Sequence, residues 1–507
     1  MIKKLSDFSR KYADVTVRWL IGMVALVFIG GFCVIAVWHL RYPYEIEWYE
    51  GLMMDHILRV VHGLPIFAKP DVYFSAALYQ PLYYYLVAPL ISLTGPSFLA
   101  GRIVTVLATS LTAVVIGLAV ARLTNKSKFA ILVSLGLLFS VYGLTDDVQT
   151  VVRIDSLYVF FVLSALYVVS FRTYSSSILT AVLLAAAYFT KQEAMFFLPL
   201  PLLWLFASDK GKSFVCAGVL ACLIAIFSVV LQHVSNGWYY YYVYAMPKAK
   251  GQYYGYLRVL AAFPTEMLKY WGVGLLLIGI FITMIRSREF KLRSVEGLWG
   301  LAVLSAIIQA CMHRGDQMSG NNVLYPFSAI FAVFFSYAVW CARNERHALA
   351  PIFEWGLLIQ LVVFIFDPRS QPNMFPGAKD REAGDNFIRY LRSIPGDVVI
   401  PAHGFLGTLA GKQTHTHCQV ENDVIVMRDS IAADYRRLWQ QAYDLHRFGA
   451  IIWDISPWHK PDSIPGYTLV GQLPSNMQVG SKMGPDIVKP TYLYLPIAPG
   501  EQSTLPH

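Results

Sequence analysis

The chain has 507 residues, of which 56% are hydrophobic and only 14% are charged, and its mean hydropathy is +0.49. Soluble proteins carry about a quarter charged residues, so this composition predicts a chain whose solvent is largely lipid. The net charge is +9, but the basic residues lie in short clusters between apolar runs and no nucleic-acid-binding motif is visible, which argues against a nucleic-acid partner.

Eleven apolar runs are candidate membrane-spanning helices, because a span needs about 20 mostly apolar residues. The first run, 19–40, is too long for the core of a signal peptide and has no small-residue cleavage site after it, so we expect a retained helix. The runs 177–190 and 192–207 are short and could form one tilted helix. The eleven runs are 19–40, 97–121, 129–145, 156–171, 177–190, 192–207, 214–233, 268–285, 296–312, 323–341 and 352–367.

Clusters of lysine and arginine precede the first span and recur only after even-numbered spans, and short basic loops of this kind face the cytoplasm. An N-terminus inside and an odd number of spans place residues 368–507 outside. The sequence therefore predicts a polytopic α-helical membrane domain over 1–367 and an extracytoplasmic α/β domain over 368–507. The clusters are Lys3, Lys4, Arg10, Lys11 and Arg18; Arg122, Lys126 and Lys128; Lys210 and Lys212; Arg286, Arg288, Lys291 and Arg293; and Arg343 and Arg346.

The predicted outer loops are longer and carry the polar groups suited to chemistry. The first, 41–80, is acidic, and the proline-bounded, tyrosine-rich stretch 80–95 is too short to span and predicts a helix in the membrane interface. The loop 234–267 is rich in tyrosine and tryptophan. Any active site is therefore expected to face outward.

In the C-terminal region we expect helices at 378–393 and 424–447 and strands at 397–401 and 449–454, an alternation typical of a small α/β layer. This region has a single cysteine and so no internal disulfide. The spacing of the residues that resemble a zinc set fits no standard structural-zinc pattern, and no metal is predicted. These residues are His403, His415, His417 and Cys418.

Acidic residues crowd the start of the first outer loop: Glu45, Glu47 and Glu50. On a helix over 48–62, Glu47 and Glu50 are near neighbours, and Asp55 would pair with Arg59 four residues later. Carboxylates beside a bilayer and beside one another should have a raised pKa, which suits a general base. The alternative is that they are solvated loop acids or charges at a helix N-terminus.

Charged residues also interrupt later apolar runs. Arg153 and Asp155 stand at the head of a span, where they either face a cavity or form an interfacial pair with Asp155 or Ser156 as helix cap. Lys191 and Gln192 break a stretch of apolar residues; the lysine could hold a phosphate or snorkel at a hairpin tip. Arg314, in the loop 313–322, is a further candidate for a phosphate or sugar.

Six short motifs, in this order, resemble bacterial GT-C glycosyltransferases, in particular the superfamily of protein O-mannosyltransferases and the lipid A aminoarabinose transferase. The motifs lie at 49–51, 63–66, 79–86, 95–102, 153–156 and 189–192, and the later spans match only by hydropathy. The resemblance implies a multi-pass protein of the bacterial inner membrane that takes a sugar from a polyprenyl-phosphate donor. It also implies an acidic base in the first outer loop, for which Glu50 matches best and Glu47 is the substitute.

By the same resemblance, Arg153, Asp155, Lys191 and Gln192 would line the donor pocket; Asp55 and Arg314 are additional binding candidates. Because the leaving group is already a phosphate, no cofactor is expected, although a divalent metal would help. The expected acceptor is an envelope lipid, glycan or protein, and the transfer inverts the sugar. Two rival functions are a lipid or glycan transporter or flippase, which should show inverted repeats and midplane charges that we do not see, and a membrane-anchored glycan-binding protein.

Overall fold

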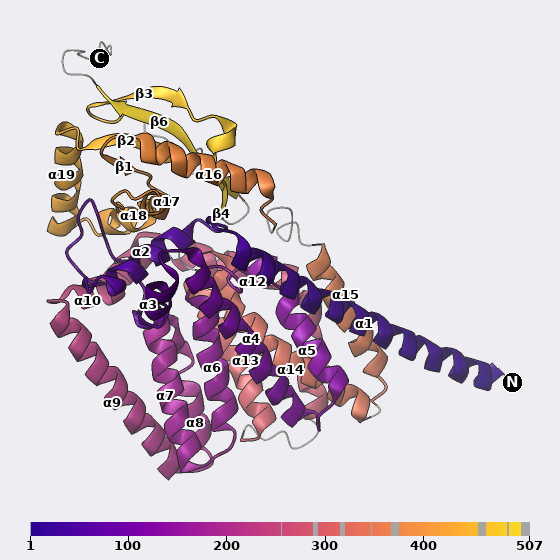
Figure 1. Cartoon of the computed structure of the whole chain (residues 1–507). Coiled ribbons are helices and arrows are strands. Elements are labelled where there is room, and N and C mark those ends of the chain that lie inside the picture. Colours follow the sequence, from indigo (N-terminus) through magenta and orange to yellow (C-terminus); the bar gives the residue numbers. More distant parts are fainter. Residues whose placement is uncertain are drawn as a thin grey trace.

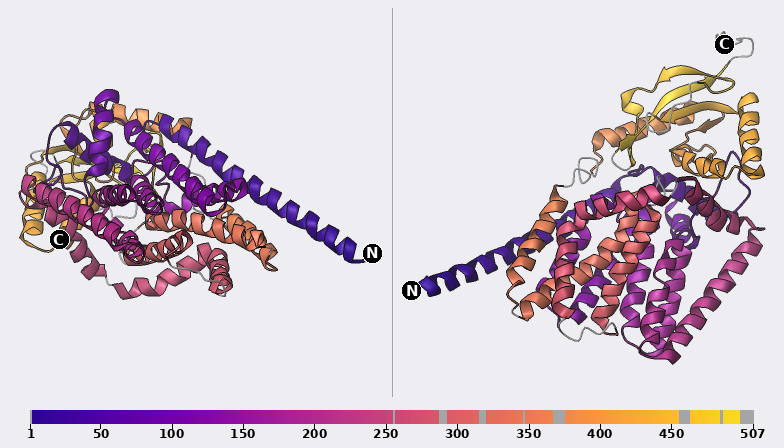
Figure 2. Two further views of the ribbon diagram at one scale, coloured as in Figure 1. Left: turned by 90° about the horizontal axis from the view of Figure 1, so that it is seen from below. Right: turned by 180° about the vertical axis from the view of Figure 1, so that it is seen from behind.

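The computed structural model is a bundle of long helices with a smaller layer of strands and helices at one end (Figure 1). Figure 2 shows the same two parts from below and from behind, with the first helix extending beyond the bundle. The described residues are 2–254, 256–286, 293–314, 320–345, 347–366, 375–454, 463–483 and 486–497.

The chain is a polytopic helical membrane protein, and each of the eleven predicted spans overlaps a helix. In the described part of the chain, six helices are long and apolar enough to cross a membrane. They are α1 (Ile2–Arg41), α4 (Phe98–Leu123), α9 (Lys210–Val234), α12 (Tyr256–Arg286), α13 (Val295–His313) and α14 (Tyr325–Asn344). The shorter apolar helices at predicted spans are α5 (Lys128–Ser140), α6 (Asp155–Val169), α7 (Tyr174–Thr190), α8 (Pro199–Phe206) and α15 (Ala350–Ile365).

Residues 177–207 form two helices rather than one. Helix α7 ends at Thr190, Lys191 is extended (φ −150°, ψ 121°), and the chain resumes as the 3₁₀ turn η2 (Gln192–Phe196) before α8. An extended residue cannot continue the hydrogen-bond ladder of a helix, so the polypeptide reverses here. The break puts Lys191 at a helix end, where its side chain can turn into the protein.

The short elements at the sheet end of the bundle come from the predicted outer loops (Figure 1). The helices predicted at 48–62 and 80–95 are α2 (Tyr49–Val61) and α3 (Leu82–Thr94). The aromatic loop forms α10 (Trp238–Tyr240), the π-helical turn η3 (Tyr241–Ala245) and α11 (Met246–Tyr254). The turn between α8 and α9, with its basic residues, lies at the opposite end of the bundle (Figure 1). Which end faces the outside stays a prediction.

The C-terminal layer contains a mixed four-stranded sheet in the order β1-β2-β6-β3, in which β1 and β2 are parallel and the other pairs antiparallel. Its strands are β1 (Asp397–Val399), β2 (Phe448–Asp454), β3 (Tyr467–Gln472) and β6 (Pro490–Pro496), and a separate hairpin pairs β4 (Ser481–Met483) with β5 (Asp486–Val488). Its helices are α16 (Ala378–Ser393), α17 (Gly404–Leu409), α18 (Cys418–Val426) and α19 (Ser430–Asp444), and it contains the 3₁₀ turn η6 (Ser475–Met477). Two further 3₁₀ turns, η1 (Gly143–Thr145) and η4 (Asn321–Leu324), belong to the helical part of the chain.

The single helix predicted over 424–447 is wrong: the structure has α18 and α19 instead. Arg428 adopts a left-handed conformation (φ 53°), and the Asp429 side chain accepts a hydrogen bond from the Ala432 amide. A left-handed residue ends one helix and an aspartate cap starts the next, and neither disturbs the apolar pattern from which the single helix was predicted. The predicted domain boundary at 367/368 lies outside the described residues.

The layer and the first outer loop share one hydrophobic core. This core joins Leu52 and Met53 of α2 with Phe405 of α17 and Tyr435 of α19. The rings of Phe98, at the start of α4, and Phe405 are 4.9 Å apart between centroids in an edge-to-face contact. The C-terminal layer therefore packs against the first outer loop, which carries the predicted base.

Candidate active site

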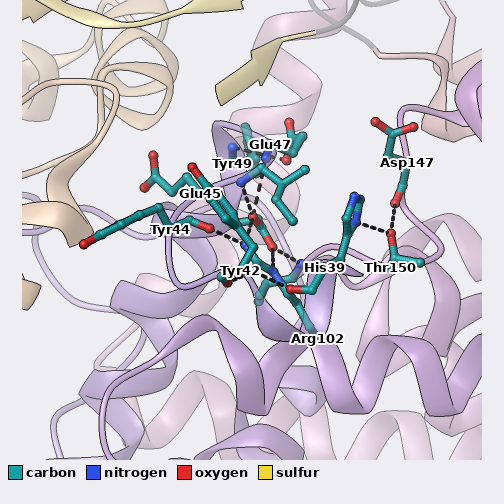
Figure 3. A network of polar contacts seen from close by, with 12 residues as sticks. His39, Tyr42, Tyr44, Glu45, Glu47, Tyr49, Arg102, Asp147 and Thr150 are labelled. Carbon is teal, nitrogen blue, oxygen red and sulfur yellow. Dashed lines mark hydrogen bonds and ion pairs between the residues drawn. The ribbon is translucent and has the colours of Figure 1, made fainter. Parts of the chain in front are cut away.

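Glu50 is fully buried and forms a two-point ion pair with Arg102 of α4. Arg102 donates through Nε to Glu50 Oε1 (2.8 Å) and through Nη2 to Oε2 (2.6 Å), and its remaining donors bond the carbonyls of His39, Tyr42 and Tyr44. The two side chains therefore fasten the end of α1 and the following loop onto α4 (Figure 3).

The remaining hydrogen-bonding capacity of Glu50 is also used. Its carboxylate accepts from the amides of Ile46 (2.7 Å) and Val152 (2.8 Å). Burial alone would raise the pKa of Glu50, but Arg102 and these hydrogen bonds outweigh it and lower the pKa. A carboxylate held ionised, with every oxygen engaged, is poorly suited to take a proton from a substrate.

Glu47 has the properties expected of a base. It is 5% exposed, its Oε2 accepts from the Tyr49 amide (3.2 Å), and it lies 3.6 Å from Arg153 Nη1. Burial raises the pKa of Glu47 to about 8 against the opposing effect of Arg153. A carboxylate whose pKa lies near neutral can both accept and release a proton at working pH.

A row of alternating charges runs from Glu47 toward the bundle. Arg153 Nε is 3.5 Å from Asp155 Oδ2, and Lys191 Nζ is 2.9 Å from Asp155 Oδ1 and 2.8 Å from Glu193 Oε1. These four side chains come from the head of α6 and from the break between α7 and η2, and all are largely buried. The structure thus brings together the residues that the sequence placed more than thirty positions apart.

Aromatic rings border this row. The Arg153 guanidinium lies over the Tyr49 ring, 4.5 Å from its centroid, and Lys191 Nζ lies 6.0 Å from the centroid of Tyr79. The Tyr49 and Tyr79 rings are 6.2 Å apart. Such rings stabilise cations and also provide flat surfaces of the kind that sugars stack against.

The loop before α14 completes one side of the row. The amides of Asn321 and Asn322 donate to Asp146 Oδ2, and Asn322 Nδ2 donates to Asp155 Oδ1 (3.0 Å). Arg314 reaches this loop through Asn321 (2.6 Å), while its guanidinium pairs with Glu266 of α12 at 2.5 Å. Arg314 is therefore tied to the edge of the row and supports it from outside.

Two predicted binding residues, Asp55 and Gln192, lie outside the row of charges and bond to neighbouring segments. Asp55 accepts from Thr414 of the C-terminal layer (3.2 Å), and Gln192 donates to the Leu78 carbonyl (2.7 Å). The predicted pair between Asp55 and Arg59 is wrong, because Arg59 turns away to donate to the Pro65 carbonyl. The contact with Thr414 comes from residues distant in sequence, which helical spacing cannot reveal.

The histidines of the C-terminal layer have separate roles. His403 lies between two acids, with Nδ1 2.5 Å from Glu45 Oε2 and Nε2 2.8 Å from Asp454 Oδ1. Burial lowers the pKa of His403, but Asp454 and Glu45 outweigh it and raise that pKa to about 10. His417 caps α18 by accepting from the Gln419 amide (3.1 Å), and the His415 ring packs edge-on against Phe448.

A cavity of about 640 Å³ lies beside the site, between the C-terminal end of α9 and the α10–η3 segment. Tyr239 in its wall donates to Gln80 (3.1 Å), the residue after Tyr79. The loop 78–80 thus separates the cavity from the charged row. Its lining residues are Ser228, Val229, Gln232, His233, Asn236, Gly237, Tyr239, Tyr240 and Tyr244.

Sequence analysis missed several members of this site. Asp146 and Asp147 follow a predicted span directly, which is a signal for functional acids that could have been used. Arg102 is the last residue of the motif at 95–102, but it was assigned no role. The roles of Glu193, Asn322 and Lys482 depend on contacts between distant segments and had no local signal.

No protein-family model matches the sequence, and no curated protein matches it significantly. Solved structures do match. ArnT from Cupriavidus metallidurans bound to undecaprenyl phosphate has a TM-score of 0.55 at 9% identity, over 85% of this chain and 93% of that chain. The archaeal oligosaccharyltransferase AglB from Archaeoglobus fulgidus, in complex with an inhibitory peptide and a dolichol-phosphate, has a TM-score of 0.51 at 12% identity, over 88% and 70%.

The chain has the GT-C fold. This confirms the fold expected from the resemblance, a polytopic helical membrane protein with a small C-terminal layer. In this GT-C chain the acids of the first loop and the cations of the later helices meet beneath that layer.

Proposed function

We propose that this GT-C protein is a glycosyltransferase that moves a sugar from a polyprenyl-phosphate donor to an acceptor of the bacterial cell envelope. Transfer would occur at the extracytoplasmic face of the inner membrane. The observation that carries the proposal is the position of Glu47, a buried carboxyl with a pKa of about 8, at one end of a row that includes Arg153 and Lys191. The two similar structures were solved with polyprenyl phosphates, which fits such a donor.

The proposed step is a single displacement. Glu47 takes the proton of the acceptor hydroxyl as its oxygen attacks the anomeric carbon from the face opposite the phosphate. The bond from that carbon to the phosphate oxygen breaks, and its electron pair leaves with the polyprenyl phosphate. One displacement inverts the anomeric carbon, and the proton ends on Glu47.

The cations have the complementary role. A phosphate leaving group gains charge as the bond breaks, and Arg153 and Lys191 are fixed before the reaction by Asp155 and Glu193. Preorganised charge of this kind stabilises a transition state without further rearrangement. Because these side chains supply the positive charge, the proposed step needs no metal, and transfer should persist in the presence of EDTA.

The remaining predicted residues take supporting roles in this proposal. Asp155 orients both cations, and Gln192 positions the loop 78–80. Asp55 bonds to Thr414 of the C-terminal layer, and Arg314 bonds to Asn321 of the loop before α14. Glu50, the other predicted base, is assigned to anchoring Arg102. The cavity beside α9 is the proposed place for the donor's lipid chain, since three tyrosine rings and Val229 form part of its wall.

Two rival functions predict different results. A transporter or flippase is disfavoured because the charged row lies at one end of the bundle, beneath the sheet layer, rather than at mid-depth. A protein that only binds glycan needs no carboxyl with a pKa near neutral. The glycan-binding rival does not predict that removing one buried carboxyl abolishes a glycan modification.

The test compares Glu47→Gln with Glu382→Gln, an exposed residue of α16 that serves as the matched control. Mass spectrometry of envelope glycans is applied to cells that lack the protein and are complemented with each variant. We expect the control to restore the modification and Glu47→Gln to fail, while both purified proteins bind undecaprenyl phosphate as the wild type does. Full modification by Glu47→Gln would overturn the mechanism, and no glycan difference without the protein would overturn the function.

A further inference from the structure

Lys482 of β4, in the C-terminal layer, pairs with the backbone of the proposed base. The Lys482 amide donates to the Ile46 carbonyl (2.8 Å), and the Trp48 amide donates to the Lys482 carbonyl (3.1 Å). These two hydrogen bonds bracket Glu47 and pair it with Lys482 as a parallel β-bridge. The backbone on both sides of Glu47 is therefore held by a strand from the far end of the chain.

The side chain of Lys482 makes a second connection. Its ammonium lies 2.9 Å from Asp147 Oδ2, and both groups are almost fully buried. Asp146 and Asp147 are consecutive residues in the left-handed conformation (φ 55° and 58°), which non-glycine residues seldom adopt. A strained pair of this kind persists only where surrounding contacts determine it, and it is found mostly at functional sites.

We propose that Lys482 is a positioning residue that locks the backbone of Glu47 onto the Asp146–Asp147 turn and so sets the geometry and charge around the proposed base. One end of the residue joins the loop of Glu47, and the other joins the segment that leads to Arg153. Calling Lys482 a positioning residue rests on the proposed function, in which Glu47 is the base. The juxtaposition itself does not depend on that function.

The packing of the neighbouring residues agrees with this role. Trp48, next to Glu47, packs against Val488 of β5 and Ala402 before α17, so its side chain is buried in the C-terminal layer. Tyr49, the residue after Trp48, packs against the rings of His417 and Trp48. Two packed aromatic residues thus fix the chain directly after the proposed base, and the side chain of Glu47 lies 3.6 Å from Arg153.

Four charged groups surround Glu47, each from a different segment. Arg153, from the start of α6, and Lys482, from β4, are cations; Glu50, from α2, and Asp146, after η1, are acids. Arg153 also has Asp155 as a partner. Loss of the Lys482 charge should leave Glu47 among more acids and make its ionised form less favourable.

The test measures the protonation of Glu47 directly, in the full-length protein in lipid nanodiscs. Infrared difference spectra are recorded across a pH titration, and the carboxyl band that disappears in Glu47→Gln reports Glu47. In Lys482→Met the midpoint should rise, because a cation that favours the ionised form of Glu47 is lost. Lys482→Arg should restore the wild-type midpoint, and the exposed Lys379→Met is the matched control.

Lys482→Gln retains a donor for Asp147 without the charge, so it gives the same upward shift and provides the test if the methionine variant does not fold. A wild-type midpoint in a folded, uncharged variant would overturn the positioning role. Transfer is measured separately. If the Lys482 variants show the shift but the wild-type protein transfers no sugar, the proposed function is refuted and the connection through Lys482 stands.

Discussion

The two neighbouring acids of the first loop should respond in opposite ways to the same chemical change. Glu50→Gln removes the charge that faces Arg102 and leaves the guanidinium buried among three carbonyls. Breaking one partner out of a buried ion pair costs roughly 3–5 kcal/mol. At pH 7 most Glu47 is protonated, because its pKa is about 8, so Glu47→Gln is nearly isosteric and should cost only about 1 kcal/mol or less.

The assay is thermal unfolding of the purified variants in detergent, followed by tryptophan fluorescence and checked by size-exclusion chromatography. Glu50→Gln should melt well below the wild type, and Glu47→Gln should melt close to it. The double variant Glu50→Leu/Arg102→Met removes both charges and should lose less stability than the sum of the single changes.

The same reasoning predicts activity. Glu47→Gln should lose transfer without losing stability, whereas any loss in Glu50→Gln should follow the loss of folded protein. If Glu50→Gln melts like the wild type and still abolishes transfer, then Glu50 takes part in the chemistry and the division of roles drawn from the hydrogen bonds is wrong.

Three further outcomes are expected. Because Glu47 must be ionised to act as a base, the transfer rate at low substrate concentration should rise with pH through a midpoint near 8. Glu47→Asp retains a carboxyl, so its pH profile should also show a single ionisation; a profile without one would contradict the role of the carboxyl. Lys191→Met should weaken binding of undecaprenyl phosphate roughly tenfold to a hundredfold, which is the effect of losing one charged hydrogen bond. Lys212→Met, at the other end of the bundle, is the control and should bind as the wild type does. Equal affinities of the two variants would exclude Lys191 from the phosphate site. The pKa of His403 is raised in the folded protein to about 10 from its ordinary 6.5, so its stabilising contribution is complete below about pH 6.5 and lost as the pH rises through 10. Across this range the melting temperature should therefore fall less steeply with pH in His403→Leu than in the wild type. An unchanged slope would contradict the pairing of His403 with Glu45 and Asp454.

Hydropathy and charge predicted the bundle well, because a lipid environment leaves few solutions for a chain with long apolar runs. The helices at the predicted spans and the short α2 and α3 follow from this constraint. The break at Lys191 could only be narrowed to two alternatives, since a turn and a tilted helix leave the same apolar pattern. In the C-terminal layer the break between α18 and α19 depends on local capping at Asp429, which hydropathy does not reveal.

The candidate residues were found more easily than their relations. Arg153, Asp155 and Lys191 interrupt apolar runs, and buried charge is costly enough to be noticed in a sequence. The sequence could not separate Glu47 from Glu50, because the difference depends on Arg102 and the Val152 amide, each from another segment. Roles that depend on Asn322 or Lys482 need the tertiary fold for the same reason.

The shared core has a consequence for how the protein is made. During synthesis the helices with Arg153 and Lys191 emerge and insert long before β4, which lies near the end of the chain. Until that strand has docked, the loop with Glu47 lacks its bridge partner and the apolar contacts that the C-terminal layer makes with Trp48. A nascent chain therefore already carries the charged groups, but the position of Glu47 relative to Arg153 is not yet fixed. Transfer activity should appear only when the hairpin of β4 and β5 has docked on the first loop.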